Sequence, residues 1–178
     1  MSTFTFMQEL FQTAVVGSMP RPLYLQELLI AKKGKIPEQK IQQHVEAAIP
    51  FIVKMQEFAG IDMVSDGEWR RLSYIGVISD LLNGFERTLK DGLWWHTVTE
   101  TLSTKNQGLF ASEAAFVKRH TLKKVKVAMP SPFTIGLRMW DAAKSKKAYA
   151  NRHDFMKALV PFLRDEVKTL ERTGVDIV

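Results

Sequence analysis

Two carboxylates on either side of a glycine form the motif of this sequence with the clearest chemical potential. Asp66 and Glu68 flank Gly67. A pair of acids around a flexible residue can bind a substrate ammonium group or accept a proton. Arg70 and Arg71 follow closely and offer a structural alternative, in which one of them forms an ion pair with these acids. The residue types alone leave both interpretations open.

Two further clusters place polar groups beside glycine or proline. Gly17 would let a ligand approach the backbone, and Ser18 supplies a hydroxyl and free amides that can hold a carboxylate. Pro130, Ser131 and Thr134 form the other cluster, which is ambiguous because prolines also shape turns into a following helix. An ordinary turn explains either cluster in isolation, so the position in the fold has to decide.

The elements that would position these clusters form an approximate internal repeat of helix, glycine and short apolar strand. One helix is predicted over residues 37–59, with Gly60 as a left-handed cap. The other is predicted to begin at the N-cap residue Asn151. Their inner prolines, Pro50 and Pro161, predict a kink or a division into two helices. The apolar positions with helical spacing are Ile41, Val45, Ile49, Ile52 and Met55 in the first helix and Phe155, Leu159, Phe162, Val167 and Leu170 in the second.

Short apolar segments without polar alternation are predicted to be strands buried on both faces, as in a parallel sheet. They are residues 13–16, 61–64, 125–129 and 175–178. Strands that alternate with helices are typical of a (βα)8 barrel, in which functional groups lie in the loops that follow the strands. Each polar cluster directly follows one of the first three strands, which favours the functional interpretation. The fourth strand coincides with the last residues, so we interpret the chain as a fragment, as half of a split protein, or as part of a longer one.

Residues 85–105 interrupt the alternation. Asp91-Gly92 precedes the aromatic and β-branched run 94–99, and this order predicts an inserted β-hairpin. The domain expected from these patterns is a single partial barrel over residues 1–178, with an insertion at about 85–110.

Composition excludes several kinds of protein. Hydrophobic residues make up 46% and charged residues 25% of the sequence, which is the balance of a globular domain. Zero cysteines exclude disulfides, thiolate nucleophiles and Cys-ligated zinc within these residues, and the four histidines show no paired spacing, so no metal ligand is assigned. The sequence shows no secretory signal and no apolar run of about 18 residues, which predicts a cytoplasmic protein without a membrane span.

The net charge of +6 makes an anionic partner a possibility to weigh. A solvated basic face is the favoured interpretation, and an anionic small substrate is the next. Nucleic-acid binding is disfavoured, because neither interleaved aromatic residues nor a known nucleic-acid motif accompanies the charge. The basic residues concentrate at Lys118, Arg119, Lys123, Lys124, Lys126, Lys144, Lys146 and Lys147.

Three runs together resemble a known family. They are residues 15–22 (VVGSMPRP), 59–71 (AGIDMVSDGEWRR) and 129–134 (MPSPFT), in this order. They resemble the catalytic domain of cobalamin-independent methionine synthase, most of all its short, single-domain homologues. The resemblance implies a (βα)8 barrel of the methionine synthase and uroporphyrinogen decarboxylase type, represented here by about its first four βα units. It also implies transfer of a methyl group from 5-methyltetrahydrofolate, in polyglutamate form, to the thiol of homocysteine.

The resemblance also implies roles for the three clusters. Gly17, Ser18 and Glu68 would contact the amino-acid part of homocysteine, and Asp66 would be their neighbour in the substrate-binding pocket. The loop that contains Pro130, Ser131 and Thr134 would lie on the folate side. No catalytic residue is assigned.

Zinc activates the thiol in this family by lowering its pKa. The His, Cys, Glu and Cys ligands of that zinc lie in the second half of the barrel, beyond the residues of this sequence. The chain alone is therefore expected to lack methyltransferase activity. Its expected partners are homocysteine, methylated folate, and either the missing half-barrel or another copy of the chain, with no nucleic acid and no membrane.

Two alternatives remain open at this stage. A corrinoid-linked or coenzyme M methyltransferase, or a uroporphyrinogen decarboxylase relative, would share the barrel but differ in methyl donor or reaction. A non-catalytic half-barrel that binds a partner through its exposed edge belongs to a different class of protein. A continuation of the reading frame with a His-x-Cys pair and a late Cys would favour the zinc-dependent enzyme, and a stop codon would favour the binding module.

Overall fold

The computed structural model describes residues 11–30, 36–90 and 93–178, and the chain divides into two compact units. The first unit contains the described residues up to Arg70, together with Glu113–Ala128 and Gly174–Val178. The second unit contains Arg71–Ser112 and Met129–Thr173. The predicted hairpin turn at 91–92 lies outside the described residues.

Parallel pairing organises the first unit. Strand β1 (Met63–Val64) pairs in parallel with strand β4 (Lys124–Val125). The segment around Ala14 bridges in parallel to β1, and Ile177 bridges in parallel to the residue that follows β4. The four segments therefore lie side by side in sequence order, as the repeat predicts, although the first and the last are reduced to single bridges.

The prediction that these segments are buried on both faces is correct only for the two inner ones. Val64 and Val125 are buried, whereas Val16 is 91% exposed and Ile177 is 40% exposed. The outer segments pair on one side only among the described residues, so their side chains are covered by fewer neighbours. The apolar runs indicated strands correctly but not their degree of burial.

Two aspartates at equivalent positions of the repeat bind the backbone of the preceding strand. Asp62 Oδ2 accepts hydrogen bonds of 2.8 Å from the N–H and the hydroxyl of Thr13. Asp176 Oδ2 accepts one of 2.8 Å from the N–H of Val125. These backbone N–H groups are the largest cause that lowers the pKa of each carboxyl below its ordinary value. The repeat is thus a repeat of hydrogen bonding as well as of element order.

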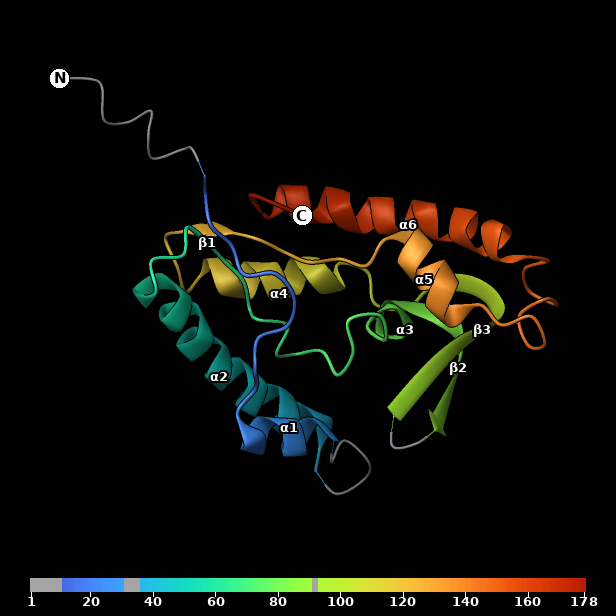
Figure 1. Ribbon diagram of the computed structural model, residues 1–178, viewed down its shortest axis with the longest axis horizontal. Coiled ribbons are helices and arrows are strands. Elements are labelled where there is room, and N and C mark those ends of the chain that lie inside the picture. The colour runs from blue at the N-terminus through green and yellow to red at the C-terminus, as the bar shows by residue number, and fades with distance from the viewer. Residues whose placement is uncertain (1–10, 31–35, 91–92) are drawn as a thin grey trace. The chain divides into compact units, whose positions relative to one another are not determined.

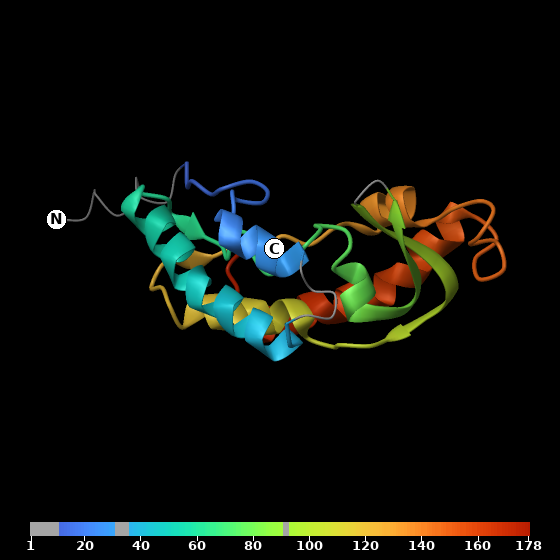
Figure 2. The same cartoon turned by 90° about the horizontal axis from the view of Figure 1, so that it is seen from below.

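Helix α2 (Glu38–Phe58) begins after Pro37 and ends at a left-handed Gly60 with φ +80°, both as predicted. It packs against α1 (Leu23–Ile30), as Figure 1 and Figure 2 show. The helix is continuous through Pro50, so the predicted division is wrong. The core of the first unit consists of Leu25, Leu29, Ile41, Val45, Ala48, Ile49, Ile52, Val53, Val64, Trp69, Val117 and Val125.

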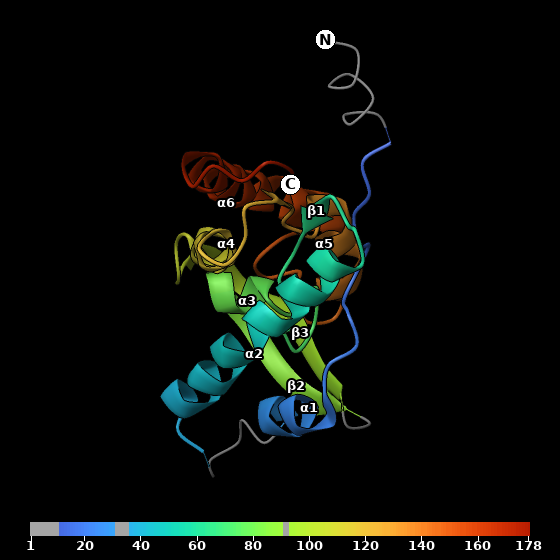
Figure 3. The ribbon, with the colours of Figure 1, turned by 90° about the vertical axis from the view of Figure 1, so that its left-hand side faces the viewer.

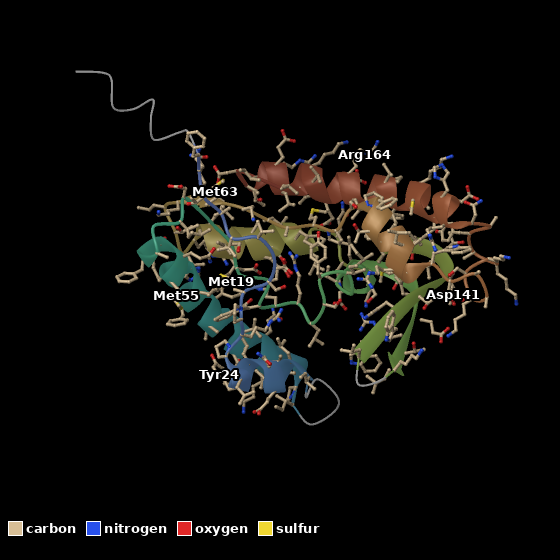
Figure 4. All side chains as sticks on the ribbon, viewed as in Figure 1. Met19, Tyr24, Met55, Met63, Asp141 and Arg164 are labelled. Atoms are coloured by element: carbon tan, nitrogen blue, oxygen red, sulfur yellow. The ribbon has the colours of Figure 1, made fainter. Side chains whose placement is uncertain are left out.

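The inner face of α2 differs from the prediction at its carboxyl end. Met55, labelled in Figure 4, is 48% exposed, while Val53 and Gln56 are buried instead. Gln56 occupies the inner position because its side-chain amide binds the backbone of Ser65, with Nε2 2.8 Å from the carbonyl and Oε1 3.1 Å from the N–H. A polar residue therefore faces the core at the point where β1 ends.

The second unit contains the predicted hairpin. Helix α3 (Ile78–Leu81) leads directly into β2 (Leu82–Lys90), which pairs antiparallel with β3 (Leu93–Thr104), as Figure 3 shows. Gly84 lies at an irregularity in the pairing, with φ +103°. A Cβ at this glycine would lie 2.9 Å from the carbonyl oxygen of Glu100, so both the conformation and the space require glycine.

Helix α6 (Arg152–Arg172) packs against α5 (Pro132–Met139) in the same unit. Asn151 is the N-cap as predicted, because its Oδ1 accepts a 3.0 Å hydrogen bond from the N–H of Asp154. The helix is continuous through Pro161, so the predicted division is wrong here as well. No helix within the described ranges combines the length and the apolar character needed to cross a bilayer.

The buried face of α6 is only partly the predicted one. Phe155, Leu159 and Leu170 are buried, whereas Val167 is exposed and Leu163 and Glu166 are buried in addition. Glu166 is buried because it accepts hydrogen bonds from the N–H groups of Gly108 (2.5 Å) and Phe110 (3.2 Å), at the amino end of α4 (Leu109–Lys118). A carboxylate at that end satisfies helix donors that would otherwise lack partners.

Candidate substrate-binding site

The loop after the first strand segment and the loop after β1 are joined by backbone contacts. The N–H of Met19 donates to the carbonyl of Gly67 (3.0 Å), and the indole Nε1 of Trp69 donates to the carbonyl of Met19 (3.2 Å). Trp69 is only 1% exposed, so its indole is an anchor in the core. Met19 is labelled in Figure 4. These contacts fix the two predicted clusters side by side.

The two clusters meet through their side chains as well. The hydroxyl of Ser18 donates a 2.7 Å hydrogen bond to Oε2 of Glu68, across a separation of 50 residues. Glu68 is 5% exposed, whereas Ser18 is at the surface. The Ser18 hydroxyl thus binds one oxygen of a nearly buried carboxylate. Gly17 beside them has φ +79°, with open space where a side chain would be.

The backbone of Glu68 adopts a conformation that non-glycine residues rarely adopt. Its φ is +57°, directly after Gly67 at φ +64°. A left-handed non-glycine residue costs on the order of 1–3 kcal/mol and persists where the surrounding structure enforces it. A Cβ on Gly67 would lie 3.2 Å from the Cβ of Met19 and 3.3 Å from the Trp69 indole, so the positive φ favours glycine and the space for a side chain is tight.

Asp66 supports this turn rather than facing solvent. Its Oδ1 accepts a 2.9 Å hydrogen bond from the N–H of Glu68. Its Oδ2 has no hydrogen-bond donor among the described residues and lies 3.8 Å from Nη1 of Arg70. Arg70 also lies 3.9 Å from Glu46, and its guanidinium is 4.5 Å from the ring centre of Phe116. The predicted ion pair between this motif and one of the two arginines is thus with Arg70.

Arg21 also contacts the turn, although its residue type and position in the sequence do not indicate this role. Its Nη2 donates to the carbonyl of Glu68 (2.5 Å), and its Nε donates a longer hydrogen bond to the carbonyl of Trp69 (3.4 Å). Burial lowers the pKa of Arg21 below its ordinary value, and the negative charges of Glu68 and Asp66 oppose that shift. Its position between two prolines marks a rigid segment but does not identify what the side chain contacts.

The third predicted cluster belongs to the second unit, whereas the residues of the site described above belong to the first. The Ser131 hydroxyl is the N-cap of α5 and accepts a 3.2 Å hydrogen bond from the N–H of Thr134. Pro132 occupies the first turn of the helix, where its missing N–H costs nothing. Within this unit, Pro130, Ser131 and Thr134 therefore shape the start of α5, which is the structural interpretation of that cluster.

Several of the clustered lysines bind backbone carbonyls near the strands of the first unit. Lys123 Nζ donates to the carbonyl of Ile61 (2.6 Å), Lys126 Nζ donates to that of Val15, and Lys118 Nζ donates to that of Gly174. The interpretation as a solvated face is wrong for Lys123 and Lys126, which are half-buried.

The described part of the chain contains no group of three or more His, Cys, Asp or Glu side chains that could hold a metal ion. His96, a histidine of the hairpin, has its Nδ1 2.7 Å from the hydroxyl of Ser79. Burial lowers the pKa of His96, the positive charge of Arg87 adds to this effect, and Asp80 opposes it. Among the described residues, His96 is thus a hydrogen-bonding partner of Ser79 within the second unit.

A family model described as "Cobalamin-independent synthase, Catalytic domain" matches residues 11–178. The chain belongs to this family. It is 26% identical over 174 residues to a methionine synthase from Sulfolobus acidocaldarius and 27% identical over 173 residues to one from Pyrococcus furiosus. In both cases the match covers 93% of this chain and 50% of the relative. The chain thus spans about half the length of these curated relatives.

Solved structures give the same result for the fold. A B12-independent methionine synthase from a Shewanella species, in complex with selenomethionine, matches with a TM-score of 0.77 and 27% identity over 93% of this chain and 50% of that one. A putative vitamin-B12-independent methionine synthase from Listeria monocytogenes matches with a TM-score of 0.72 and 19% identity. The family resemblance expected from the three sequence runs is confirmed.

Proposed function

We propose that this chain forms the amino-acid-binding part of a (βα)8-barrel methyltransferase that transfers the methyl group of 5-methyltetrahydrofolate to homocysteine. It would supply about the first four βα units of the barrel, with β2 and β3 as an insertion. Family membership and the in-order parallel pairing support this proposal. The observation that carries it is the contact between the Ser18 hydroxyl and the nearly buried Glu68 carboxylate.

This pair has the groups that an α-amino acid requires. The Glu68 carboxylate would accept hydrogen bonds from the ligand ammonium, and charge-assisted bonds of this kind are among the stronger ones in proteins. The ammonium would replace the Ser18 hydroxyl as a donor to Glu68, which frees the hydroxyl to donate to the ligand carboxylate. Gly17 leaves open space beside these groups. The selenomethionine named for the Shewanella structure is an amino acid of this kind.

Other residues have supporting roles in the proposal. Asp66 would act through the backbone of Glu68, because one of its oxygens binds that N–H and the other faces Arg70. The loop with Pro130, Ser131 and Thr134 would border the folate, as the family resemblance implies. Polyglutamate is the form of the folate that we propose as donor.

Zinc belongs to the proposed reaction but not to this chain's own residues. The sequence has no cysteine, and the described residues offer no cluster of ligands, so the residues here do not fit a zinc site. Zinc would be bound by residues outside this chain. The chain's own contribution is to bind and orient the amino-acid end of the thiol substrate.

The proposal is tested by titrating the 178-residue chain with L-methionine, followed by NMR. Glu68→Gln should weaken binding about ten- to hundredfold, which corresponds to the loss of one charge-assisted hydrogen bond. Glu86→Gln is the matched control, since Glu86 is a surface residue of the hairpin paired with Lys144 (2.7 Å), and it should bind like the wild type.

The complete protein that contains these residues would be assayed for methyl transfer to homocysteine with zinc supplied. Loss of activity in Glu68→Gln is expected. Unchanged affinity and activity in that variant would refute the assignment of Glu68, and transfer from a corrinoid or to coenzyme M in preference would replace the proposed reaction.

A further inference from the structure

Glu68 contacts Ser18 (2.7 Å) with its backbone in the left-handed region. A residue with a Cβ ordinarily avoids this region, and Gly67 before it offers no resistance to a rearrangement. Something outside the turn must therefore hold Glu68 in place. The described contacts of its backbone show what does so.

We propose that Arg21 is the positioning residue of this site, which keeps Glu68 in its left-handed conformation and its carboxylate aimed at the ligand. The inference deepens the proposed function, because it rests on Glu68 as the group that binds the substrate ammonium. Arg21 itself contacts the backbone of the turn and acts through Glu68.

The two peptide groups that flank the Cα of Glu68 form hydrogen bonds with different side chains. Oδ1 of Asp66 accepts a hydrogen bond from the N–H of Glu68 (2.9 Å), and Nη2 of Arg21 donates to its carbonyl (2.5 Å). Rotation about the N–Cα and Cα–C bonds moves one of these peptide groups relative to the other. Fixing both therefore fixes φ and ψ. Asp66 belongs to the turn itself. Arg21, 47 residues away in sequence, holds the Glu68 carbonyl from outside the turn. The N–H of Met19 holds the preceding peptide group from outside, through the carbonyl of Gly67 (3.0 Å).

Arg21 is built into the first loop in a way that suits this role. Pro20 and Pro22 lie on either side of Arg21. Each proline has its own φ fixed at about −65° and restricts the residue before it to extended conformations, so Pro22 restricts Arg21. The side-chain amide of Gln26 donates to the carbonyl of Arg21 (2.9 Å), which ties the residue to α1. The guanidinium is half-buried, and the carboxylates of Glu68 and Asp66 favour its charged form. The charged Arg21 side chain, on a loop restricted by two prolines, thus donates to the carbonyl of the left-handed residue Glu68.

A ligand-independent measurement tests the conformational part of the proposal. At positive φ the amide and α protons of a residue lie close together, so Glu68 in the wild-type chain should give a strong intraresidue NOE between them. Arg21→Ala should weaken that NOE towards the level of residues with negative φ. The matched control is Arg87→Ala, which removes an arginine that also donates to a backbone carbonyl, that of Ser79 (3.1 Å), in the second unit. It should leave the Glu68 NOE unchanged.

Binding of L-methionine tests the functional part by a double-mutant cycle with Glu68→Gln. Arg21→Ala alone should weaken the affinity about tenfold or more, the factor expected for one charge-assisted hydrogen bond. In the Glu68→Gln background the same change should weaken it less than about threefold, because the group on which Arg21 acts is already disabled. A general loss of structure would lower the affinity equally in both backgrounds.

The outcomes separate the two proposals. An unchanged NOE in Arg21→Ala, or an equal loss of affinity in both backgrounds, overturns the role of Arg21. A third outcome is possible, in which the wild-type chain shows the NOE, Arg21→Ala loses it, and the wild-type chain binds no methionine. This outcome supports the positioning contact and refutes the proposed function. If Arg21→Ala does not fold, Arg21→Met keeps the length of the apolar stem, has no N–H donor for the Glu68 carbonyl, and takes its place in both measurements with the same expected results.

Discussion

Replacement of Gly67 by alanine tests whether the turn at the candidate site is set by conformation alone or also by close packing. The residue has φ +64°, and an added Cβ would lie 3.2 Å from Met19 Cβ and 3.3 Å from the Trp69 ring. The left-handed conformation costs alanine about 1–2 kcal/mol. Overpacking against a fixed neighbour costs about 1–3 kcal/mol more. The expected loss in the free energy of unfolding is therefore about 2–5 kcal/mol.

Gly60 provides the matched control within the same unit. Its φ of +80° is equally left-handed, but nothing lies within 4 Å of an added Cβ. Gly60→Ala should therefore cost only the conformational part, about 1–2 kcal/mol. Urea unfolding followed by tryptophan fluorescence measures both variants, since Trp69 is buried beside the turn. Equal losses in the two variants would show that the contact of Gly67 with Met19 and Trp69 carries no energy, and would refute the packing argument.

Further predictions concern pH, a helix cap and the hairpin. Asp176 has a lowered pKa in the folded chain. Its contribution to the free energy of unfolding is therefore present above its ordinary pKa of 3.8 and is lost as the pH falls through the pKa of the folded chain. In Asp176→Asn the free energy of unfolding, measured by denaturation at several pH values, should decrease less steeply at acidic pH than in the wild type. His96 also has a lowered pKa, so its contribution to the free energy of unfolding is present above about pH 6.5 and is lost on acidification. Titration followed by NMR should give a pKa of His96 below 6.5. A higher pKa would refute the argument that burial disfavours its charged form. Asn151→Ala should cost about 1 kcal/mol through loss of the N-cap of α6, measured by urea unfolding, and no change would mean that Asp154 N–H is equally well solvated.

The sequence predicted the elements that depend on local signals. Gly60 and Asn151 were identified as helix-terminal residues because a cap requires only a few neighbouring residues. Proximity of Ser18 and Glu68 followed from the placement of both after parallel strands. The inner prolines were misleading because a helix can continue through a proline when surrounding contacts compensate for the missing hydrogen bond.

Residues whose role depends on distant partners were not predictable in this way. Arg21 was left without a role because its acceptors, the carbonyls of Glu68 and Trp69, lie almost 50 residues away. Gln56 took an inner position expected for an apolar residue because the backbone of Ser65 needed partners. The positive φ of Glu68 could not be predicted from its residue type, since contacts made in the folded chain impose it.

The two aspartates at equivalent positions of the repeat each bind a strand that lies earlier in the sequence. Asp62 reaches back 49 residues to Thr13, and Asp176 reaches back 51 residues to Val125. Each of these steps closes a loop of similar size, so each carries a similar entropic cost. The donor strand has always left the ribosome before the aspartate that binds it. At these two junctions the new segment can therefore bind the one made before it during synthesis, whereas at the middle junction, between β1 and β4, Lys123 Nζ donates to the carbonyl of Ile61 instead.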